Sequence, residues 1–459
     1  MKPAYALLLS GTFSVLAGPL WAQERDAQIL RPGEVRLSIG AEYRHADTQF
    51  GAGGSERIGG ELEASLTAAT VATLGTVASD FSRFLADTKS LPGASQVDPF
   101  ELTAGDLSVE AAVNRRFVPV RLSAGIFPRV EIDVEIPVYR EERLLRRFST
   151  EGGNVGINPD PSSNAELLAG ISEAGESLAG AALLPVEGSA LADELQRRVL
   201  TLTGSELDLP AAPVPGTQLS SVSALFPAAR SLTQWQPGDV RIGARVGVLR
   251  SFGDSPFPPL SSGERHHRLT AFAAVRVPTG REWVADSRLG AGSTIGFAGG
   301  QAGAVADLFL GERYWLSGGG SYARVASTEL DVPVPPAEGI YTGEPVLTTI
   351  RRSPGDAYDL WFVPRIRLTP VISFGGSLRS ERWLAGMDEI GSLQLPTTAA
   401  SRHSAGISVR YTTLPVSSDG GFDIAIGYAG AFAGSGRAEA ASVAYFQVAV
   451  RQRVLGRSN

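Results

Sequence analysis

Apolar and polar side chains alternate strictly in the stretch that begins at Gly238. Over residues 240–248 the even positions are Val, Ile, Ala, Val and Val, and the odd positions are Arg or Gly. Successive side chains of a β-strand point to opposite faces, so this period of two predicts a strand with one apolar and one polar face. The pattern returns over 268–277 and in the Gly- and Ala-rich run 293–310. Three such strands in succession, each about 10 residues long, are typical of a transmembrane β-barrel.

Further segments carry the same alternation and raise the number of predicted strands to twelve. They cover 34–44, 108–126, 130–138, 314–325, 358–368, 372–383, 404–414, 422–432 and 443–454. Bacterial barrels have an even number of strands, and their long loops lie on the outside. With the N-terminus in the periplasm, every long connection of this chain falls on the outer side. The apolar positions change parity within 108–126, which predicts a β-bulge near Arg115 and Arg116.

Two of the long connections show helical periodicity. Apolar residues recur at helical spacing over 61–87, which predicts an amphipathic helix. In the connection 141–236, Ser163 and Glu166 form a capping-box pattern ahead of helical stretches that reach Leu202. These inserts are longer than ordinary loops. They form either a solvated surface loop or a helical plug or cap over the barrel mouth, since apolar helix faces must pack against something.

The first 22 residues have the pattern of a secretory signal peptide. Lys2 supplies the positive charge, residues 6–16 form an apolar core too short to span a bilayer, and Ala22 marks a plausible cleavage position. We expect the remainder, 23–459, to be a single outer-membrane barrel with helical inserts at about 58–92 and 141–236. The mature chain has no apolar run long enough for a transmembrane helix, which needs about 18 residues.

Composition narrows the class of protein further. The chain has no cysteine, which excludes disulfides and cysteine–metal sites. Glycine is frequent, at 53 of 459 residues, and only 19% of residues are charged. With a mean hydropathy of +0.03, this composition fits an outer-membrane barrel better than a soluble periplasmic protein. The net charge of −7 argues against nucleic acid as a partner.

The charges on the polar faces of the predicted strands are the candidate functional residues. By parity they point into the barrel: Arg36, Glu42, Glu131, Asp133, Glu135, Arg241, Arg245, Arg276, Arg365, Arg367, Arg379, Arg451 and Arg453. The same rule adds Glu34, Arg44, Asp239, Arg268, Asp359, Glu381, Arg410 and Asp423. They can neutralise one another as cross-strand ion pairs, or they can line a passage that selects solutes. Arg365 and Arg367 are expected to contribute most of a modest positive excess.

The histidines do not form a catalytic or metal-binding pattern. His45 and His403 fall near strand ends, and His266 and His267 lie on a predicted periplasmic loop. A hydrolase needs a histidine beside its nucleophile, and a zinc site needs at least a third protein ligand. We therefore expect no enzyme activity, no metal site and no cofactor.

Several short motifs resemble those of a known family. Gly-Asp-Val-Arg-Ile-Gly at 238–243 is followed by Val-Arg-Val-Pro-Thr-Gly at 275–280 and by Ser-Pro-Gly-Asp at 353–356. An early hairpin at 124–132 reads Ala-Gly-Ile-Phe-Pro-Arg-Val-Glu-Ile. These motifs resemble the outer-membrane transporter family named for the meta pathway of phenol degradation, over about 106–139 and 237–454. The resemblance implies a barrel and uptake of hydrophobic or aromatic compounds, and the helical inserts lie outside it.

The sequence therefore predicts an all-β fold: a transmembrane antiparallel barrel of about 12 strands in the bacterial outer membrane, with helical insertions in long extracellular loops. We expect a channel or passive transporter for small molecules, with membrane lipid and a small solute as partners and no nucleic acid. No oligomeric state is predicted. The alternative is a non-conducting barrel whose extracellular helical inserts bind a partner. A barrel of this size lies between filled barrels of about 8 strands and open porins, so a narrowed lumen is expected.

Overall fold

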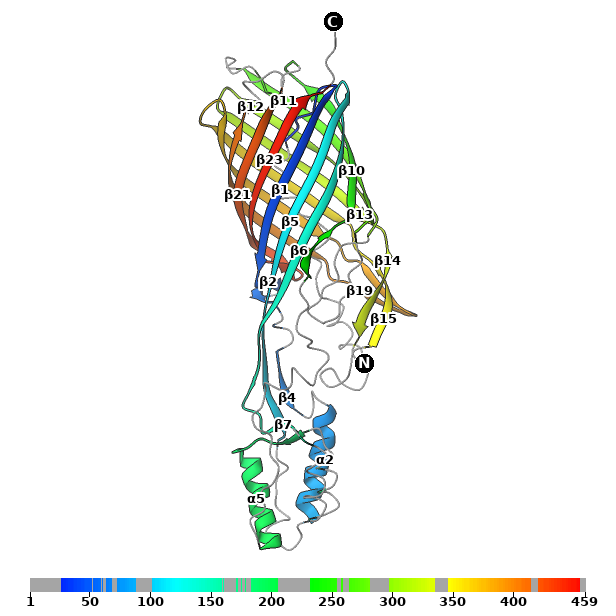
Figure 1. The fold of residues 1–459 in the computed structure, drawn as a ribbon, viewed down its shortest axis with the longest axis vertical. Coiled ribbons are helices and arrows are strands. Elements are labelled where there is room, and N and C mark those ends of the chain that lie inside the picture. Colours follow the sequence, from blue (N-terminus) through cyan, green and yellow to red (C-terminus); the bar gives the residue numbers. More distant parts are fainter. Residues whose placement is uncertain are drawn as a thin grey trace.

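A closed antiparallel barrel of twelve long strands forms the main body of the described chain in the computed structural model (Figure 1). The barrel strands are β1 (Glu34–Ala46), β5 (Thr103–Phe127), β6 (Val130–Glu151), β10 (Val240–Arg250), β11 (Arg265–Val277), β12 (Gly299–Leu310), β13 (Tyr314–Val325), β16 (Ala357–Arg367), β17 (Ile372–Trp383), β20 (Ala400–Thr412), β21 (Gly420–Ser435) and β23 (Ser442–Arg453). Each pairs with the next barrel strand along the chain, and β23 returns to pair with β1. The predicted fold class is confirmed.

The structure describes residues 26–454 with gaps. The gaps are 52, 59, 61–62, 68–71, 88–100, 159, 161–170, 172–174, 176–177, 179–182, 205–231, 254–256, 259–263, 281–296, 335–345 and 414–419. The predicted signal peptide, the capping box at Ser163 and the first residues of the strand predicted from 293 lie outside the described residues. The corresponding strand, β12, begins at Gly299.

The outer face of the barrel is apolar, as the alternation predicts. Ile39, Ile242, Leu360, Ile407 and Ile426 point outward, and each side chain is between 43% and 60% exposed. Outward aromatic residues lie toward both ends of the barrel, and they include Tyr314, Tyr411 and Phe422 at one end and Tyr43, Tyr322 and Tyr358 at the other. An exposed apolar band between aromatic girdles is the surface of a barrel that crosses a membrane. The barrel thus belongs to the bacterial outer membrane.

The two ends of the barrel differ. At the short-turn end, where β1 begins and β23 ends, successive strands are joined by connections such as Pro128-Arg129 and residues 311–313. At the opposite, long-loop end, the connections are long and carry smaller sheets. One contains β14 (Thr328–Val334), β15 (Val346–Ser353), β18 (Met387–Ile390) and β19 (Leu393–Pro396), and another contains β2 (Thr48–Gly51), β3 (Gly54–Arg57) and β22 (Ala438–Glu439). The longest connections share one end, as predicted, although the β10–β11 connection at the short-turn end also spans residues 251–264.

An arm projects from the long-loop end, at the bottom of Figure 1. It consists of the part of the β5–β6 hairpin beyond the end of β1, with β4 (Ala64–Thr67), α2 (Ala72–Asp87), β7 (Val155–Ile157), β8 (Leu183–Pro185) and α5 (Ala190–Thr203). The strand β9 (Leu232–Pro237) pairs with β6 nearer the barrel. Because both helices lie at the tip of the arm, neither of them fills the lumen (Figure 1).

The helices of the arm are specified by local sequence signals. Leu74, Val77, Phe81 and Phe84 recur at helical spacing on α2 and are all buried. The Ser189 hydroxyl caps α5 by accepting a hydrogen bond from the Ala192 amide at 3.2 Å, and Gly204 ends the helix in the left-handed conformation at φ 67°. No described helix has the length and apolarity that a membrane-spanning helix requires.

Two boundaries differ from those predicted. The helix expected from residue 61 begins at Ala72, because residues 64–67 pair with β5 as β4. The bulge expected at Arg115 and Arg116 is absent from the β5–β6 pairing, whose register shifts instead at Glu110/Ala111 and at Gly125/Phe127. The parity switch has another cause. β1 stops opposite Val113, so the residues of β5 before that point no longer have a lipid-facing side that must be apolar.

A lysine at Ile242 tests the membrane-facing assignment. Because Ile242 points outward between Val134 and Val275, Ile242→Lys is expected to lower the free energy of unfolding in lipid vesicles by about 2–4 kcal/mol. The matched control is Leu368→Lys at the short-turn end, expected to cost about 0–1 kcal/mol. Gly243 is unsuitable as a control, because a Cβ there would come within 2.6 Å of the Asp133 carboxylate. Equal losses at Ile242 and Leu368 would contradict the assignment.

Protease added to intact cells tests the orientation. If the long-loop end faces the outside, a protease added to whole cells will cut within the arm and leave the barrel intact. Cleavage of the arm only after the outer membrane has been opened would reverse the orientation. Fragment masses measured after each treatment distinguish the two results.

Candidate functional site

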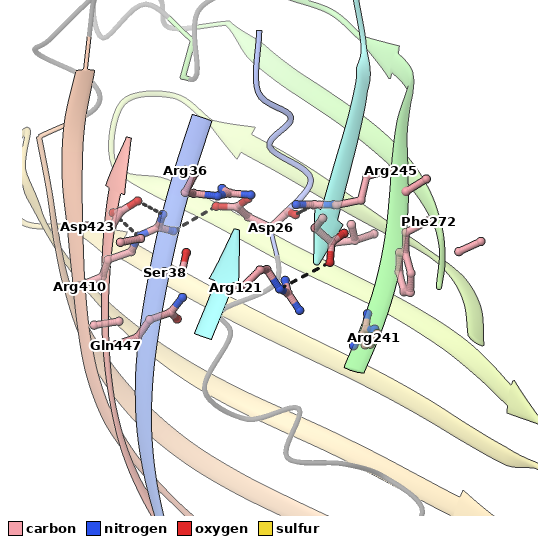
Figure 2. A pocket seen from close by; sticks show the side chains of 16 residues that line it. Asp26, Arg36, Ser38, Arg121, Arg241, Arg245, Phe272, Arg410, Asp423 and Gln447 are labelled. Carbon is pink, nitrogen blue, oxygen red and sulfur yellow. Dashed lines mark hydrogen bonds and ion pairs between the residues drawn. The ribbon is translucent and has the colours of Figure 1, made fainter. Parts of the chain in front are cut away.

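A short segment ahead of β1 lies inside the barrel. The Gly33 amide donates a hydrogen bond to the Gly125 carbonyl at 2.9 Å at the short-turn end, and the chain before it enters the lumen. Residues 26–30, here called the lumen segment, reach the charged centre of the barrel, where Asp26 lies among side chains from opposite walls (Figure 2). Asp26, Ala27, Gln28 and Leu30 are all at least 95% buried. The lumen is therefore occupied along part of its length by the protein's own chain.

Side chains of the wall hold the backbone of the lumen segment. The Ala27 amide donates to the Asp307 carboxylate at 3.0 Å, and the Ala27 carbonyl accepts from the Thr270 hydroxyl at 2.6 Å. The Leu30 amide donates to the Glu131 carboxylate at 3.0 Å. The segment has no strand partner, so these contacts satisfy backbone groups that would otherwise be buried without hydrogen bonds.

The Asp26 carboxylate sits among arginines from four strands. Arg410 donates to it at 3.2 Å, Arg268 lies 4.0 Å away, and Arg245 donates to the Asp26 carbonyl at 2.5 Å. Burial raises the pKa of Asp26, but Arg268, Arg410, Arg245 and Arg36 together outweigh it, so its pKa lies well below the ordinary value. The contribution of this charge to stability is present at neutral pH and is lost only when the pH falls through the lowered pKa.

The acidic row of β6 is matched by arginines of its neighbours. Arg36 on β1 donates to Glu131 at 2.8 Å, and Arg245 lies 3.7 Å from the same carboxylate. Arg121 on β5 donates to Glu135 at 2.5 Å and lies 3.7 Å from Asp133. The Glu131 carboxylate is completely buried. These residues form the cross-strand ion pairs expected of charges in a lumen.

The other candidates divide between the two ends of the barrel. Toward the long-loop end, Arg379 contacts Asp359 at 2.7 Å and Glu381 at 3.0 Å. Glu42 is buried, and its Oε2 atom has no hydrogen-bond partner among the described residues. At the short-turn end, Arg451 pairs with Glu34, whereas Arg453 is exposed at the end of β23.

Arg365 is buried and Arg367 is partly buried, so their expected contribution to a positive excess stays a prediction. Arg365 is 2% exposed, stacks 4.5 Å from the Trp315 ring centre, and donates to Ser317 at 2.9 Å. Arg367 lies 5.4 Å from the ring centre of Phe257. Both are held against aromatic rings, where the guanidinium plane is attracted to the ring face.

A cavity of about 90 Å³ remains beside the lumen segment. Its charged lining, shown in part in Figure 2, comprises Arg36, Arg121, Arg241, Arg245 and Arg410 against Asp26, Asp133 and Asp423. Gln447, Ser38 and Phe272 complete much of the remaining wall. Arg276 does not line this cavity, but its cross-strand neighbour Arg241 does. The cavity is polar, carries more arginines than carboxylates, and is large enough for a few water molecules of about 30 Å³ each.

Aromatic residues line other parts of the lumen. Phe257, Phe309 and Trp315 form a buried cluster toward the short-turn end, and Arg268 lies 5.4 Å from the Phe309 ring centre. On the wall, the ring centres of Phe272 and Trp361 are 6.4 Å apart. These two rings lie over Gly303 and Gly319, where a Cβ would overlap them. The lumen is thus polar at its centre and aromatic on one side.

The histidines are placed as structural residues. His45 is 2.7 Å from Asn114 Oδ1, and the rings of His266 and Phe252 meet edge to face at 5.7 Å. His403 lies beside Phe432. Within the described ranges, no group of three His, Asp or Glu side chains is arranged to hold a metal ion.

Sequence reasoning missed some residues that matter most. Asp26 lies outside every strand, so no alternation could place it. Asp307, at 1% exposure, lies on β12, whose Gly- and Ala-rich sequence does not distinguish a polar face from an apolar face. Arg121 obeys the parity of β5, and stricter application of that rule would have found it.

Comparisons with known proteins add little to this geometry. No family model matches the chain, and no curated protein matches it. Among solved structures, the COG4313 outer membrane channel from Pseudomonas putida F1 is 10% identical, with 94% of this chain and 98% of that chain covered and a TM-score of 0.44. The CymD monoaromatic hydrocarbon channel is 9% identical over 92% of this chain and 89% of that one, at a TM-score of 0.28.

The translocator domain of the autotransporter NalP from Neisseria meningitidis gives a TM-score of 0.30 at 8% identity, over 93% of this chain and 90% of that one. Likenesses this distant carry no argument about function. The barrel assignment depends on the strands and their pairing, and the family suggested by the sequence motifs stays a prediction.

Substitution of Glu131 tests whether the buried ion pairs stabilise the barrel. Glu131→Gln removes the carboxylate that pairs with the partly buried Arg36 and Arg245 and weakens the contact to the Leu30 amide. The free energy of unfolding should therefore fall by about 3–5 kcal/mol. The control is Glu312→Gln on an exposed turn, with an expected change within about 0.5 kcal/mol. Urea unfolding in vesicles measures both. A loss at Glu131 as small as that at Glu312 would contradict a structural role for the pair.

Proposed function

We propose that this protein is an outer-membrane channel or passive transporter for small molecules, closed at rest by its lumen segment. The observation that supports this most directly is the filling of the lumen. Inside a closed barrel, residues 26–30 are attached to several walls through polar contacts, and a polar cavity lies beside them.

The contacts that hold the lumen segment are suited to release. They are hydrogen bonds and ion pairs to side chains of the wall, with no β-sheet pairing. Water or a polar solute can replace such partners one at a time, and the net contribution of each is about 0.5–1.5 kcal/mol, or about 1.5–3 when one partner is charged. Movement of the segment would join the cavity to the rest of the lumen.

The solutes are proposed to be small, and hydrophobic or aromatic compounds are among them. Two features support this class. The sequence motifs resemble a family associated with uptake of such compounds. In addition, Phe272 and Trp361 present rings to the lumen, and offset aromatic rings bind another ring with about 0.5–1.5 kcal/mol beyond area burial. The charged lining of the cavity supports a preference for anions among small ions.

Conductance in planar bilayers tests the proposed closure. The wild type should conduct weakly, and replacement of residues 26–30 by a Gly-Ser segment of equal length should raise the conductance several-fold. The matched control removes the tip of the arm, which lies away from the lumen, and should leave the conductance unchanged. In a salt gradient, Arg241→Ala with Arg245→Ala should shift the reversal potential toward cations, and high salt should screen the difference.

The arm supports a second candidate function, a non-conducting barrel that presents its helices to a partner. The specific observation is that both helices of the arm have buried apolar residues, which include Leu74 and Phe81 on α2 and Leu191 and Val199 on α5, away from the barrel (Figure 1). If neither the wild type nor the variant without residues 26–30 conducts, the channel proposal is refuted and this alternative is favoured.

A further inference from the structure

A groove of about 800 Å³ crosses the outer face of the barrel. It lies on the lipid side, because most of its lining residues belong to the outward parity of their strands: Ala41, Tyr43, Arg116, Val118, Trp235, Phe374, Ile407, Val409, Ile426, Tyr428, Ala444 and Phe446. Sites that bury small apolar ligands measure about 300–1,000 Å³. The groove is therefore large enough to hold acyl chains, and it has no connection with the lumen segment.

The strand register explains the shape of the groove. Two neighbouring rows of outward residues run across the strands along the hydrogen-bonding direction. The first row contains Arg116, Tyr43, Ala444, Tyr428 and Ile407, and the second contains Val118, Ala41, Phe446, Ile426, Val409 and Phe374. The small side chains of Ala41 and Ala444 lie between bulky neighbours and give the groove its depth.

The groove is inclined across the membrane. It begins at Tyr43, near the long-loop end. Four strands away it reaches Phe374, which is the third residue of β17 and therefore lies near the short-turn end. Rows of paired residues are perpendicular to the strands, and barrel strands tilt by about 35–45°. Five inter-strand steps of about 4.8 Å make a path of about 24 Å that descends about 15 Å, the hydrocarbon depth of one leaflet.

Arg116 lines the shallow end of the groove, and the partly buried Arg140 lies beside it on the neighbouring strand. Arg116 and Arg140 are directly opposite each other on β5 and β6, and both belong to the outward parity of their strands. Tyr43 pairs with Arg116 on the other side, and Trp235 on β9 lines the groove at this level. Arg116 is exposed and makes no hydrogen bond or ion pair with any described residue.

We propose that this groove is a binding site for a phosphorylated, acylated lipid of the outer leaflet, of the lipid A class. The phosphate lies between Arg116 and Arg140 and accepts charge-assisted hydrogen bonds from their guanidiniums. Tyr43 and Trp235 occupy the headgroup level, where amphipathic rings are favoured. One acyl chain then follows the inclined groove past Ala444 and Ala41. Charge complementarity selects a lipid with an anionic headgroup, and the apolar path selects the lipid over free phosphate.

Lipid retention by the purified barrel tests the site. Wild-type protein in detergent is titrated with bisphosphorylated lipid A, and the bound lipid is counted by native mass spectrometry. We expect one tightly retained lipid, and an affinity about tenfold or more weaker for Arg116→Gln with Arg140→Gln. The matched control is Arg382→Gln, an exposed arginine on β17 outside the groove, and it should bind like the wild type.

Further binding measurements separate the contribution of the headgroup from that of the acyl chain. Ala444→Phe fills the groove on the exposed face without changing the lumen, and it should also weaken binding. Dephosphorylated lipid A should bind weakly to the wild type, and inorganic phosphate should not displace the intact lipid. The proposal is overturned by equal lipid retention in the wild type and the double arginine variant, by displacement with phosphate alone, or by equal binding of the dephosphorylated lipid.

Discussion

Closure of the hydrogen-bonded ring is the constraint on which the rest of this structure depends. Hydrocarbon offers no partner to backbone amides and carbonyls, so a sheet that crosses a membrane must leave no edge. Here the first and last barrel strands, β1 and β23, pair over twelve residues of β1. Closure fixes the parity of every strand, and parity decides which side chains meet lipid and which meet the lumen. The apolar outer band and the charged interior both follow from this geometry.

The interior shows how a barrel of this width accommodates many charges. Arginines and carboxylates of neighbouring strands neutralise one another, and Asp26 adds a negative charge at the point where Arg245, Arg268 and Arg410 converge. A buried charge without a partner would cost several kcal/mol, about 3–5 when a pair is broken. The lumen segment is thus an electrostatic part of the wall as well as an obstruction, which links the stability of the barrel to the closure of its lumen.

The strands could be predicted from the sequence because lipid imposes a period of two on them. Residues 240–248 follow this rule without exception, and 268–277 depart from it only at Phe272 and Ala274 on the lumen face. Beyond the rim the rule no longer applies, and the predicted bulge at Arg115 and Arg116 was wrong for that reason. Inside the barrel, parity indicates only that a residue such as Arg365 points inward. It does not indicate that Trp315 will cover it. The lumen segment has no periodicity, so the role of Asp26 could be found only in three dimensions.

The position of the lumen segment also constrains how the protein is assembled. Its contacts come from β6, β10, β11, β12 and β20, which are synthesised after it. The seam between β1 and β23 joins the first barrel strand to the final one, so it cannot form before the final strand is present. Once the seam has formed, the chain start can reach the centre only through an end of the barrel. The segment therefore enters either before the strands close around it or through the short-turn end, where Gly33 is held.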